Sequence, residues 1–401
     1  MSEKKILIVG AGFGGIRCAL DLAEHHLDTM KITLVNPTPH FEYHATLYRL
    51  LTGRSALETC IPLRDIFKHK KNIDIVEDFI TDVQFKMNVA LGKSGSMYQY
   101  DYLVLALGSE TAYYDVPGLK ELSFTLKSVT DALKLKRHLH EIFSSQVIVV
   151  GGGATGVEVA GELALYTKKL LENHIVQAPL LTIDLITSSK CLVPQLPLDL
   201  SIEISRRLRD LGVNIYFNRK VTKEEVGEVF MKDMSIRSKT VIWAAGVEGN
   251  ELYKKFGLPV NSKGQVIVNK YLQPLLSNLY SLSSNIYVIG DGTDTKFSGM
   301  AQTALDHGHL VARNIMRQIQ GQSLEIHYPE EPIYAIPVGN NWAAVSMHGM
   351  NFYGRLGWYI RRFLQLQFFL SILPFPKALT AFKEDGILWE SCPICRGEIF
   401  D

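Results

Sequence analysis

The chain has 401 residues, and its 42 lysines and arginines stand against 41 aspartates and glutamates, which gives a formal net charge of +1. This length predicts two or three folded domains, and the charge balance argues against nucleic acid as the main partner, because phosphate binding needs excess positive charge. Five cysteines are few and odd in number, so a reducing compartment is favoured over a disulfide framework. No apolar stretch reaches the roughly 18–20 uncharged residues that span a bilayer, so any membrane contact is expected to be peripheral.

The first predicted elements form a nucleotide-binding turn. Residues 4–9 are a β-rich run (KKILIV) that enters the cluster GAGFGG, and a helix over residues 16–27 and a second strand follow. In this strand–turn–helix setting the pattern G-x-G-x-x-G has a physical basis. Gly10 permits the tight turn, Gly12 lets the backbone approach a pyrophosphate, and Gly15 lets helix and strand pack closely. The free N–H groups at the start of the helix then bind phosphate oxygens.

A second copy of this turn lies further along the chain. Residues 146–150 (QVIVV) are a predicted strand, the motif repeats with Gly151, Gly153 and Gly156, and residues 157–171 continue as a helix. Glycines used only for turns would explain one copy, whereas two complete copies indicate two separate nucleotide sites.

Three further apolar runs end on a glycine, as buried strands near a ligand often do. They are residues 102–108, 240–246 and 285–290. Asp291 follows the third run and can accept hydrogen bonds from ribitol or ribose hydroxyls, although a turn or helix-cap aspartate is the alternative. A helical pattern over residues 300–320 comes next.

The composition changes beyond Pro329, since no acidic residue occurs between Glu331 and Glu384. A helical wheel separates two faces in this region. The apolar face carries Phe352, Leu356, Tyr359, Ile360, Phe363, Leu364 and Leu366, and the other face carries Arg355, Arg361, Arg362 and Gln365. A basic helix of this kind, followed by an apolar run over residues 368–375, indicates contact with a membrane surface that carries anionic lipid. The alternative is a helix buried on the protein's own sheet or in a dimer interface.

The order of these motifs resembles that of the two-dinucleotide-binding flavoproteins, the pyridine nucleotide-disulfide oxidoreductase-like superfamily. Within it, the stretches VIVVGGGATGVEVAGEL (residues 147–163) and AQTALDHGHLVARNI (residues 301–315) resemble type II NADH dehydrogenases. Those enzymes are single-chain, non-proton-pumping NAD(P)H:quinone oxidoreductases bound to one membrane leaflet. The resemblance covers nearly the whole chain, including the amphipathic C-terminal segment.

The resemblance implies which residues hold the cofactor and the substrates. FAD would be bound by Gly10, Gly12, Phe13, Gly14, Gly15, Asn36, Ala106, Gly108, Asp291, Ala301 and Gln302. The nicotinamide dinucleotide would be bound by Gly151, Gly153, Thr155, Gly156, Glu158, Thr187, Ala245 and Gly246. Glu158 matches a position near the flavin–nicotinamide contact, and Ala301 and Gln302 match an alanine–glutamine pair at the mouth of the quinone pocket.

Several positions depart from the family's pattern. Asn36 replaces the acid that usually grips the FAD ribose and hydrogen-bonds hydroxyls more weakly. Thr187 stands where a glutamate would select NADH, and with Lys190 close by, the repulsion against a 2′-phosphate is removed. We therefore expect NADPH to be used at least comparably with NADH. Asp306 replaces a second glutamine of the quinone motif, and residues 40–45 (HFEYHA) replace a more apolar loop that contains proline.

The flavin would supply the redox chemistry, while the protein supplies position and electrostatics. Hydride transfer needs the nicotinamide and flavin rings stacked with the reacting atoms about 3–3.5 Å apart. The helix that begins near residue 300 would direct its N-terminal amides at the charge of the reduced flavin. Quinone reduction also needs two protons. The catalytic candidates are Glu158, Gln302 and Asp306, whereas His307 and His309 could equally be packed or surface histidines.

The spacing of the cysteines distinguishes this chain from the disulfide reductases of the same superfamily. Disulfide reductases need a close redox pair, and the nucleotide domains contain neither C-x-x-C nor C-x4-C. Cys18 is expected to pack inside the first helix. Cys392 and Cys395 resemble half of a zinc ribbon but lack two ligands, so a metal shared across a dimer, a redox-active tail and a bystander pair all stay open, and no metal site is assigned.

The sequence thus predicts an α/β fold with two Rossmann-like dinucleotide-binding domains, for FAD and NAD(P), plus a C-terminal amphipathic membrane-associating region. Residues 1–112 and 272–330 would form the FAD domain, residues 113–271 the NAD(P) domain and residues 331–401 the membrane or interface region. The expected activity is FAD-dependent NAD(P)H:quinone oxidoreduction, peripheral on the cytoplasmic side of a membrane, with a homodimer as an option. The alternatives are a soluble FAD- and NAD(P)H-binding redox sensor and a reductase of a protein electron carrier.

Overall fold

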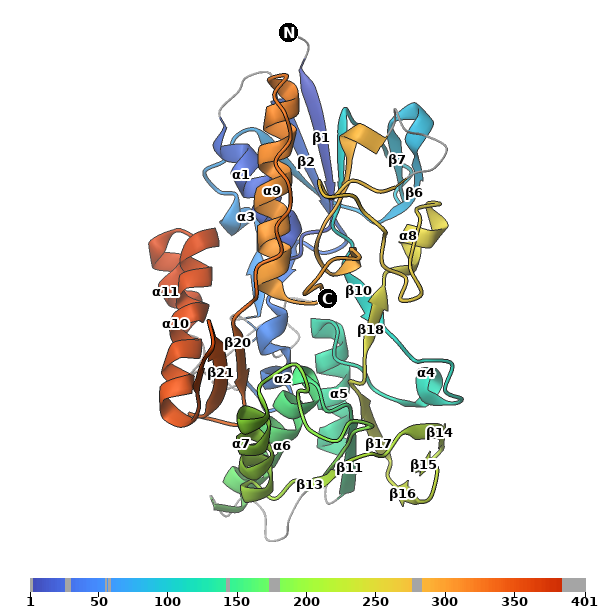
Figure 1. Cartoon of the computed structure of the whole chain (residues 1–401), viewed down its shortest axis with the longest axis vertical. Coiled ribbons are helices and arrows are strands. Elements are labelled where there is room, and N and C mark those ends of the chain that lie inside the picture. Colours follow the sequence, from blue (N-terminus) through green and yellow to red (C-terminus); the bar gives the residue numbers. More distant parts are fainter. Residues whose placement is uncertain are drawn as a thin grey trace. The chain divides into compact units, whose positions relative to one another are not determined.

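The structure, a computed structural model, describes residues 3–25, 30–54, 56, 59–141, 145–172, 181–275 and 283–383 (Figure 1). The chain divides into two compact units. Unit 1 comprises Met1–Phe41, Ile61–Glu110 and Val247–Pro332, and unit 2 comprises Glu42–Cys60, Thr111–Gly246 and Ile333–Asp401. Residues 247–271, which the sequence analysis places in the NAD(P) domain, group with unit 1, because Val266 exchanges backbone hydrogen bonds with Gly292 and Asp294 of that unit.

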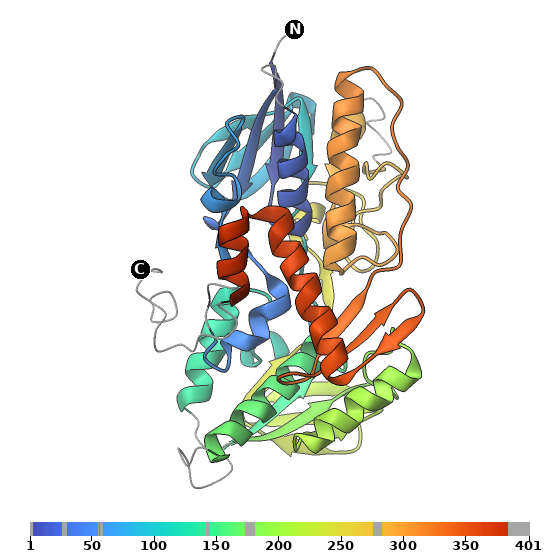
Figure 2. The ribbon, with the colours of Figure 1, turned by 90° about the vertical axis from the view of Figure 1, so that its left-hand side faces the viewer.

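A five-stranded parallel sheet forms the centre of unit 1, in the order β19-β9-β1-β2-β5. Its strands are β1 (Lys4–Val9), β2 (Met30–Asn36), β5 (Ile73–Glu77), β9 (Tyr102–Leu105) and β19 (Ile286–Val288). The central strands are apolar along their whole length, as expected of a sheet covered on both faces. Helices α1 (Phe13–Glu24) and α9 (Ala301–Ile319) lie side by side in both views (Figures 1 and 2). The odd-numbered apolar side chains of β1 and β9 form a hydrophobic cluster with side chains of β6, β7 and α8.

The other elements of unit 1 are short. They are β3 (His40–Glu42), β4 (Cys60–Pro62), α3 (Leu63–Ile66), β6 (Ile80–Gln84), η3 (Phe85–Met87), β7 (Val89–Gly92), β8 (Met97–Gln99), β10 (Ser109–Thr111), β18 (Val247–Gly249), α8 (Glu251–Lys255), η4 (Ser283–Asn285) and η5 (Gly290–Gly292). β6, β7 and β8 form an antiparallel sheet. β3, β4 and β10 lie where the chain passes from one unit to the other along the sequence.

Unit 2 repeats the parallel arrangement with four strands in the order β13-β12-β11-β17. Its strands are β11 (Ser145–Val150), β12 (Leu181–Ile186), β13 (Asn214–Tyr216) and β17 (Thr240–Trp243). The helices of this part are η1 (His44–Thr46), α2 (Leu47–Leu50), α4 (Leu119–Leu122), α5 (Val129–Glu141), α6 (Ala154–Glu172) and α7 (Leu198–Asp210). An antiparallel sheet joins β14 (Val221–Glu225), β15 (Glu228–Met231) and β16 (Ser235–Arg237). The predicted α/β class with two Rossmann-like parallel sheets is therefore confirmed.

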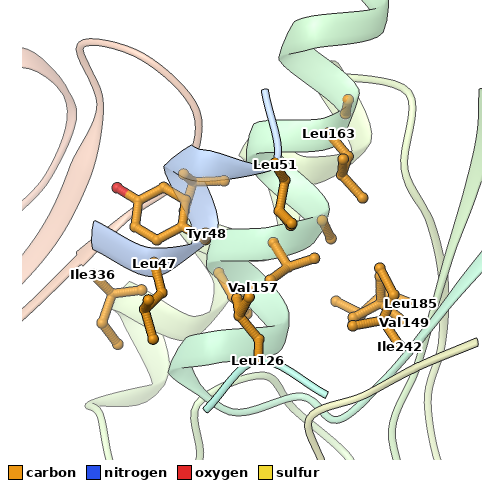
Figure 3. Packing of buried hydrophobic residues seen from close by; sticks show 14 of the residues in the cluster. Leu47, Tyr48, Leu51, Leu126, Val149, Val157, Leu163, Leu185, Ile242 and Ile336 are labelled. Atoms are coloured by element: carbon orange, nitrogen blue, oxygen red, sulfur yellow. The ribbon is translucent and has the colours of Figure 1, made fainter. Parts of the chain in front are cut away.

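The core of unit 2 includes a segment that the sequence analysis left without a role. Leu47, Tyr48 and Leu51 insert against Val157 and Leu163 of α6 (Figure 3). Each of these side chains is at most 3% exposed. Residues 47–51 therefore belong to the hydrophobic core of unit 2, although they precede α6 by about a hundred residues of sequence.

The C-terminal part of unit 2 consists of an antiparallel sheet and a helical hairpin (Figure 2). The sheet joins β20 (Tyr334–Pro337), β21 (Ala343–Met347) and β22 (Met350–Phe352), and the hairpin joins α10 (Gly354–Ile372) and α11 (Phe375–Lys383). α10 packs on β20 and β21, where Gly357 lies so close that a Cβ on it would overlap the carbonyl oxygen of Ala343. Within the described part of the chain, no helix combines the length and hydropathy needed to cross a bilayer.

The orientation of α10 differs from the one expected of a basic membrane helix. Arg361 and Gln365 of the predicted polar face are buried, at 6% and 3% exposure. Leu356, Tyr359 and Phe363 of the predicted apolar face are 57%, 68% and 65% exposed. The prediction that the basic face is open to anionic lipid is therefore wrong for Arg361, because interactions inside unit 2 hold its guanidinium.

Candidate functional site

The first glycine turn of unit 1 is tight at two positions and open at a third. Gly10 has φ +102°, which favours glycine, and a Cβ on it would overlap the carbonyl oxygen of Ala106. A Cβ on Gly15 would overlap the carbonyl oxygen of Gly10. No described atom lies within 4 Å of a Cβ built on Gly12. The turn therefore closes helix α1 onto β1 and leaves its outer side open for a pyrophosphate.

The turn of unit 2 has the same construction, nearly atom for atom. Gly151 has φ +131° and lies against the carbonyl oxygen of Ala244, and Gly156 lies against the carbonyl oxygen of Gly151. No described atom lies within 4 Å of a Cβ built on Gly153. The first glycine of each turn donates its N–H to the strand beside it over 2.8 Å, Gly10 to Val35 and Gly151 to Ile186. Each unit thus contains one complete dinucleotide cradle.

Asn36, at the end of β2, bonds within the protein. Its Oδ1 accepts the N–H of Ala11 over 2.8 Å, and its Nδ2 donates to the carbonyl oxygen of Thr38 over 2.8 Å. A carboxylate could make only the first of these bonds, because it has no hydrogen to donate. Asn36 therefore links the glycine turn to the loop after β2.

The ends of β9 and β19 meet beside this turn. Ser109 Oγ lies 3.2 Å from Asp291 Oδ2 and donates to it, and the backbone carbonyl of Asp291 accepts hydrogen bonds from Gln265 and Ser298. The carboxyl ends of parallel strands share one edge of the sheet. The predicted residues Ala106, Gly108 and Asp291 therefore lie along that edge with the glycine turn.

Helix α9 begins at the same edge. A Cβ on Gly14 would lie 2.9 Å from the carbonyl oxygen of Ala304, and one on Gly308 would lie 2.6 Å from that of Gly14. This close approach brings the first turns of α1 and α9 together, with the predicted residues Ala301 and Gln302 at the start of α9. Both helices therefore direct their N-terminal dipoles toward this part of unit 1.

His307 and His309 are structural, as the second reading of the sequence allows. His307 is fully buried, and its Nδ1 accepts the N–H of Gly290 over 3.1 Å. Burial lowers the pKa of His307 to about 3, with a further contribution from His327, so the ring is neutral at physiological pH. His309 Nδ1 lies 2.5 Å from Asp21 of α1. The two rings fasten α9 to its neighbours.

Glu158 lies on the first turns of α6, close to a buried arginine. Burial raises the pKa of Glu158 to about 8, although the charge of Arg361 acts in the opposite direction. The side chain keeps some accessible surface, but its carboxyl group lies deep in the protein. Arg361 donates to the carbonyl oxygen of Ala45 over 3.1 Å and to the hydroxyl of Tyr48 over 3.3 Å. At neutral pH Glu158 therefore holds a proton next to a fixed positive charge.

The other residues that the sequence analysis assigned to the sites lie on or next to the helices and strands expected for them. Asp306 is half-buried on α9, and burial, followed by the charge of Glu330, raises its pKa. Thr187 follows β12, and Ala245 follows β17, at the carboxyl edge of the sheet of unit 2. A Cβ on Gly246 would overlap the hydroxyl of Tyr114. Thr155 is exposed on the first turn of α6.

The sequence analysis missed three contacts around these sites. Tyr253 accepts the N–H of Leu107 over 3.1 Å, Ser109 binds Asp291, and Tyr48 and Arg361 meet beside Glu158. None of these residues stands in a motif. Ser109 directly follows the predicted Gly108, whereas Tyr253, Tyr48 and Arg361 come from distant segments. The one signal available for Arg361 was an arginine in a stretch that has no acidic residue.

No disulfide joins Cys18, Cys60 and Cys191, the cysteines among the described residues. Cys18 is fully buried in α1, as predicted, and burial raises the pKa of its thiol. Cys60 is buried and Cys191 is partly exposed. Cys392 and Cys395 lie outside the described residues.

Comparison with known proteins gives consistent matches. The family model described as pyridine nucleotide-disulphide oxidoreductase matches residues 4–308. Type II NADH:quinone oxidoreductase of Staphylococcus aureus is 28% identical over 349 residues, which cover 80% of this chain and 84% of that protein. NDH2 of Plasmodium falciparum, solved in complex with NADH, has a TM-score of 0.83 at 19% identity and covers 96% of this chain and 97% of that one. The sulfide:quinone oxidoreductase of Aquifex aeolicus has a TM-score of 0.75 at 20% identity, with 92% and 91% covered.

Proposed function

The chain belongs to the pyridine nucleotide-disulphide oxidoreductase family, and from that membership we propose that it is an FAD-dependent NADH:quinone oxidoreductase. The observation that carries the proposal is the pair of matching cradles, one in each unit, each with two crowded glycines and one open glycine. The similarity to a type II NADH:quinone oxidoreductase over 80% of the chain supports quinone as the acceptor. The overall reaction is NADH + H⁺ + quinone → NAD⁺ + quinol.

The residues of unit 1 fit FAD. The open side of Gly12 accommodates a pyrophosphate, and the half-buried Asp291 offers a carboxylate to sugar hydroxyls. The start of α9, at Ala301 and Gln302, supplies backbone N–H groups and a dipole that favour negative charge. FAD bound there would supply two-electron chemistry between the nicotinamide and the acceptor.

The residues of unit 2 fit the dinucleotide substrate. The open side of Gly153 and the N–H groups at the start of α6 bind its pyrophosphate, and Ala245 and Gly246 lie just beyond the end of β17, at the carboxyl edge of the same sheet. The reaction then requires the nicotinamide to reach the flavin within about 3–3.5 Å.

Glu158 supplies a proton in this proposal. NADH brings two electrons and one hydrogen nucleus as hydride, so the conversion of quinone to quinol needs one more proton. A carboxyl group with a pKa of about 8 carries that proton at pH 7. Arg361 stabilises the carboxylate that remains after the transfer. Gln302 and Asp306 are further candidates for contact with the quinone.

We also propose peripheral attachment through α10 and α11. Tyr353, Leu356, Tyr359, Phe363, Leu370 and Phe375 are 43–68% exposed along these two helices. No acid interrupts residues 332–383, and Arg355 and Lys383 are exposed. Apolar side chains flanked by exposed basic ones suit a leaflet with anionic lipid. The small and odd number of cysteines, five in 401 residues, favours a reducing compartment and hence the cytoplasmic side. A second copy is the alternative occupant of the same face.

Steady-state oxidation of NADH by the purified FAD-loaded protein tests the activity. With a water-soluble quinone analogue under anaerobic conditions, we expect catalytic NADH oxidation and a matching amount of quinol. A protein that binds FAD and NADH but turns over only with a protein electron carrier would favour the carrier-reductase alternative. A protein that binds both and turns over with neither acceptor would favour the sensor.

A further inference from the structure

We infer that the dinucleotide site of unit 2 accepts NADPH, because two polar segments at the end of β12 form a binding site for the 2′-phosphate of its adenosine ribose. The segments are residues 187–190 and residues 218–220. This inference rests on the proposed function only in that unit 2 binds a reduced dinucleotide, and it deepens that proposal by assigning the kind of dinucleotide.

Thr187 occupies the position that normally decides between NADH and NADPH. Val150 of β11 pairs with Ile186 of β12, so Thr187 is the first residue beyond the sheet, beside Gly151. In dinucleotide-binding sheets an acid near this place bonds the 2′-hydroxyl and repels a 2′-phosphate. Thr187 carries no charge, is 3% exposed, and its Oγ1 accepts the N–H of Ser189 over 3.2 Å. It therefore shapes the loop and leaves recognition to its neighbours.

The neighbours of Thr187 present hydroxyls and a positive charge. Ser188 and Lys190 are exposed, and Ser189 is partly exposed. None of residues 187–191 (TSSKC) is acidic. Hydroxyl and ammonium groups are donors that a phosphate dianion can accept from.

The fold adds a second cationic segment that is distant in the sequence. The N–H of Arg219 donates to the carbonyl oxygen of Thr187 over 2.9 Å, and the N–H of Asn218 donates to that of Ser189 over 3.1 Å. Asn218 has φ +55°, which makes a sharp turn here. These bonds fix Arg219 and Lys220 beside the loop that carries Lys190. Two chain segments that carry Lys190, Arg219 and Lys220 thus lie side by side at the carboxyl end of β12.

The acidic groups of this region do not cancel that charge. Arg219 pairs with Asp233 over 3.3 Å, with side chains 37% and 54% exposed. An ion pair so open to water is weak, so a phosphate can share or replace Asp233 while Arg219 keeps its position. Asp184 is fully buried inside β12, where Asn214 and Gln146 donate to it.

Binding of two fragments tests the inference without electron transfer. Calorimetry of the FAD-loaded protein compares 2′,5′-ADP with 5′-AMP, which differ only in the 2′-phosphate. We expect 2′,5′-ADP to bind at least about tenfold more tightly, and Lys190→Met and Arg219→Met each to weaken it about tenfold while leaving 5′-AMP unchanged. Ser188→Asp places a carboxylate at an exposed position and should reverse the preference.

A matched control is Lys239→Met. Lys239 is also exposed, but it precedes β17 and lies at the opposite edge of the same sheet, so this variant should bind both fragments as the parent does. Equal affinities of the parent for the two fragments, or unchanged 2′,5′-ADP binding by both Lys190→Met and Arg219→Met, would overturn the inference and leave the proposed NADH:quinone activity standing. Tight 2′,5′-ADP binding without quinone turnover would instead support the 2′-phosphate site and contradict the proposed NADH:quinone activity.

Discussion

Gly12 and Gly15 belong to one motif, but a methyl group would have different effects at the two positions. At Gly15 it would overlap the carbonyl oxygen of Gly10, whereas at Gly12 no described atom lies within 4 Å. Gly12 also has φ −76°, which alanine adopts without strain. The space beside Gly12 is therefore kept for the ligand, and the absence of space at Gly15 reflects the packing of helix on strand.

We predict that Gly12→Ala folds normally but binds FAD at least about tenfold more weakly, the equivalent of ~1.4 kcal/mol. Gly15→Ala should instead lower the stability of unit 1 even without FAD. Thermal unfolding of the apoprotein and flavin titration separate the two effects. If Gly12→Ala kept the affinity of the parent for FAD, the phosphate would not lie against this turn.

The proton held by Glu158 has a predictable effect on rate. Since its pKa is about 8, the group is protonated at pH 7 and loses its proton as the pH rises through that value. We predict that quinone reduction slows above about pH 8, and that Glu158→Gln lowers the rate about a hundredfold and removes this alkaline limb. A variant that retains the alkaline limb would exclude Glu158 as the proton donor.

Stability gives an independent readout of the same group. The ordinary pKa is 4.5 and the folded value is about 8, so between these values the folded protein binds a proton that the unfolded chain has released. The free energy of unfolding should therefore fall as the pH rises across this window. Glu158→Gln should flatten that fall. Melting temperatures between pH 5 and pH 9 measure it, whatever the acceptor proves to be.

At this scale the sequence predicts what depends on neighbouring residues alone. The turn glycines follow from a local backbone requirement, and their construction in the structure agrees with it. The environment of Glu158 does not follow from any local requirement, because Tyr48 and Arg361 reach it from segments more than a hundred residues away. Likewise, only the folded chain brings Arg219 beside Thr187.

Helix α10 shows how an element can be predicted and its rotation missed. The helical wheel correctly separates an apolar face from a basic face. Hydropathy alone, however, predicts that the apolar face points into the protein or the lipid and that the arginines point into water. In the structure Arg361 turns inward because it satisfies the carbonyl oxygen of Ala45 and the hydroxyl of Tyr48. Arg362 bonds Gln365 and the carbonyl oxygen of Phe382 and lies over the Phe382 ring.

The exposed face of α10 leads to a prediction about membrane binding. Replacing Tyr359 and Phe363 together by serine should weaken binding to anionic vesicles about tenfold or more, since each aromatic ring contributes on the order of 1 kcal/mol. Co-sedimentation with vesicles measures it. Met87→Ser is the control, because Met87 is 67% exposed on unit 1 and should not matter. Vesicle binding unchanged by the double substitution, together with loss of a dimer, would assign the face to a second copy.

The inward arginine leads to a prediction about stability. Arg361→Met leaves the carbonyl oxygen of Ala45 without its charged donor and should destabilise unit 2 by about 2 kcal/mol. Arg355→Met, on the exposed side of the same helix, should cost almost nothing. Urea unfolding followed by tryptophan fluorescence compares them. Equal effects of the two substitutions would contradict the inward orientation of Arg361.

On the scale of the whole molecule, two similar parallel sheets each carry the same strand–glycine turn–helix construction. The motif order predicts both parallel sheets and their division between two nucleotides, because each strand–glycine–helix unit is local. The division of the chain between the units is harder to predict, since Val247–Pro332 returns to unit 1 and Glu42–Cys60 contributes core residues to unit 2. Such crossings depend on long-range packing, which no sequence motif marks.

The most direct test of two dinucleotide cradles serving one electron transfer is an anaerobic absorbance titration of the purified protein. The account predicts a yellow protein whose flavin bands bleach when a stoichiometric amount of NADH or NADPH is added and return when a quinone analogue follows. A protein that stays colourless after incubation with FAD, or whose bound flavin neither nucleotide can bleach, would contradict it.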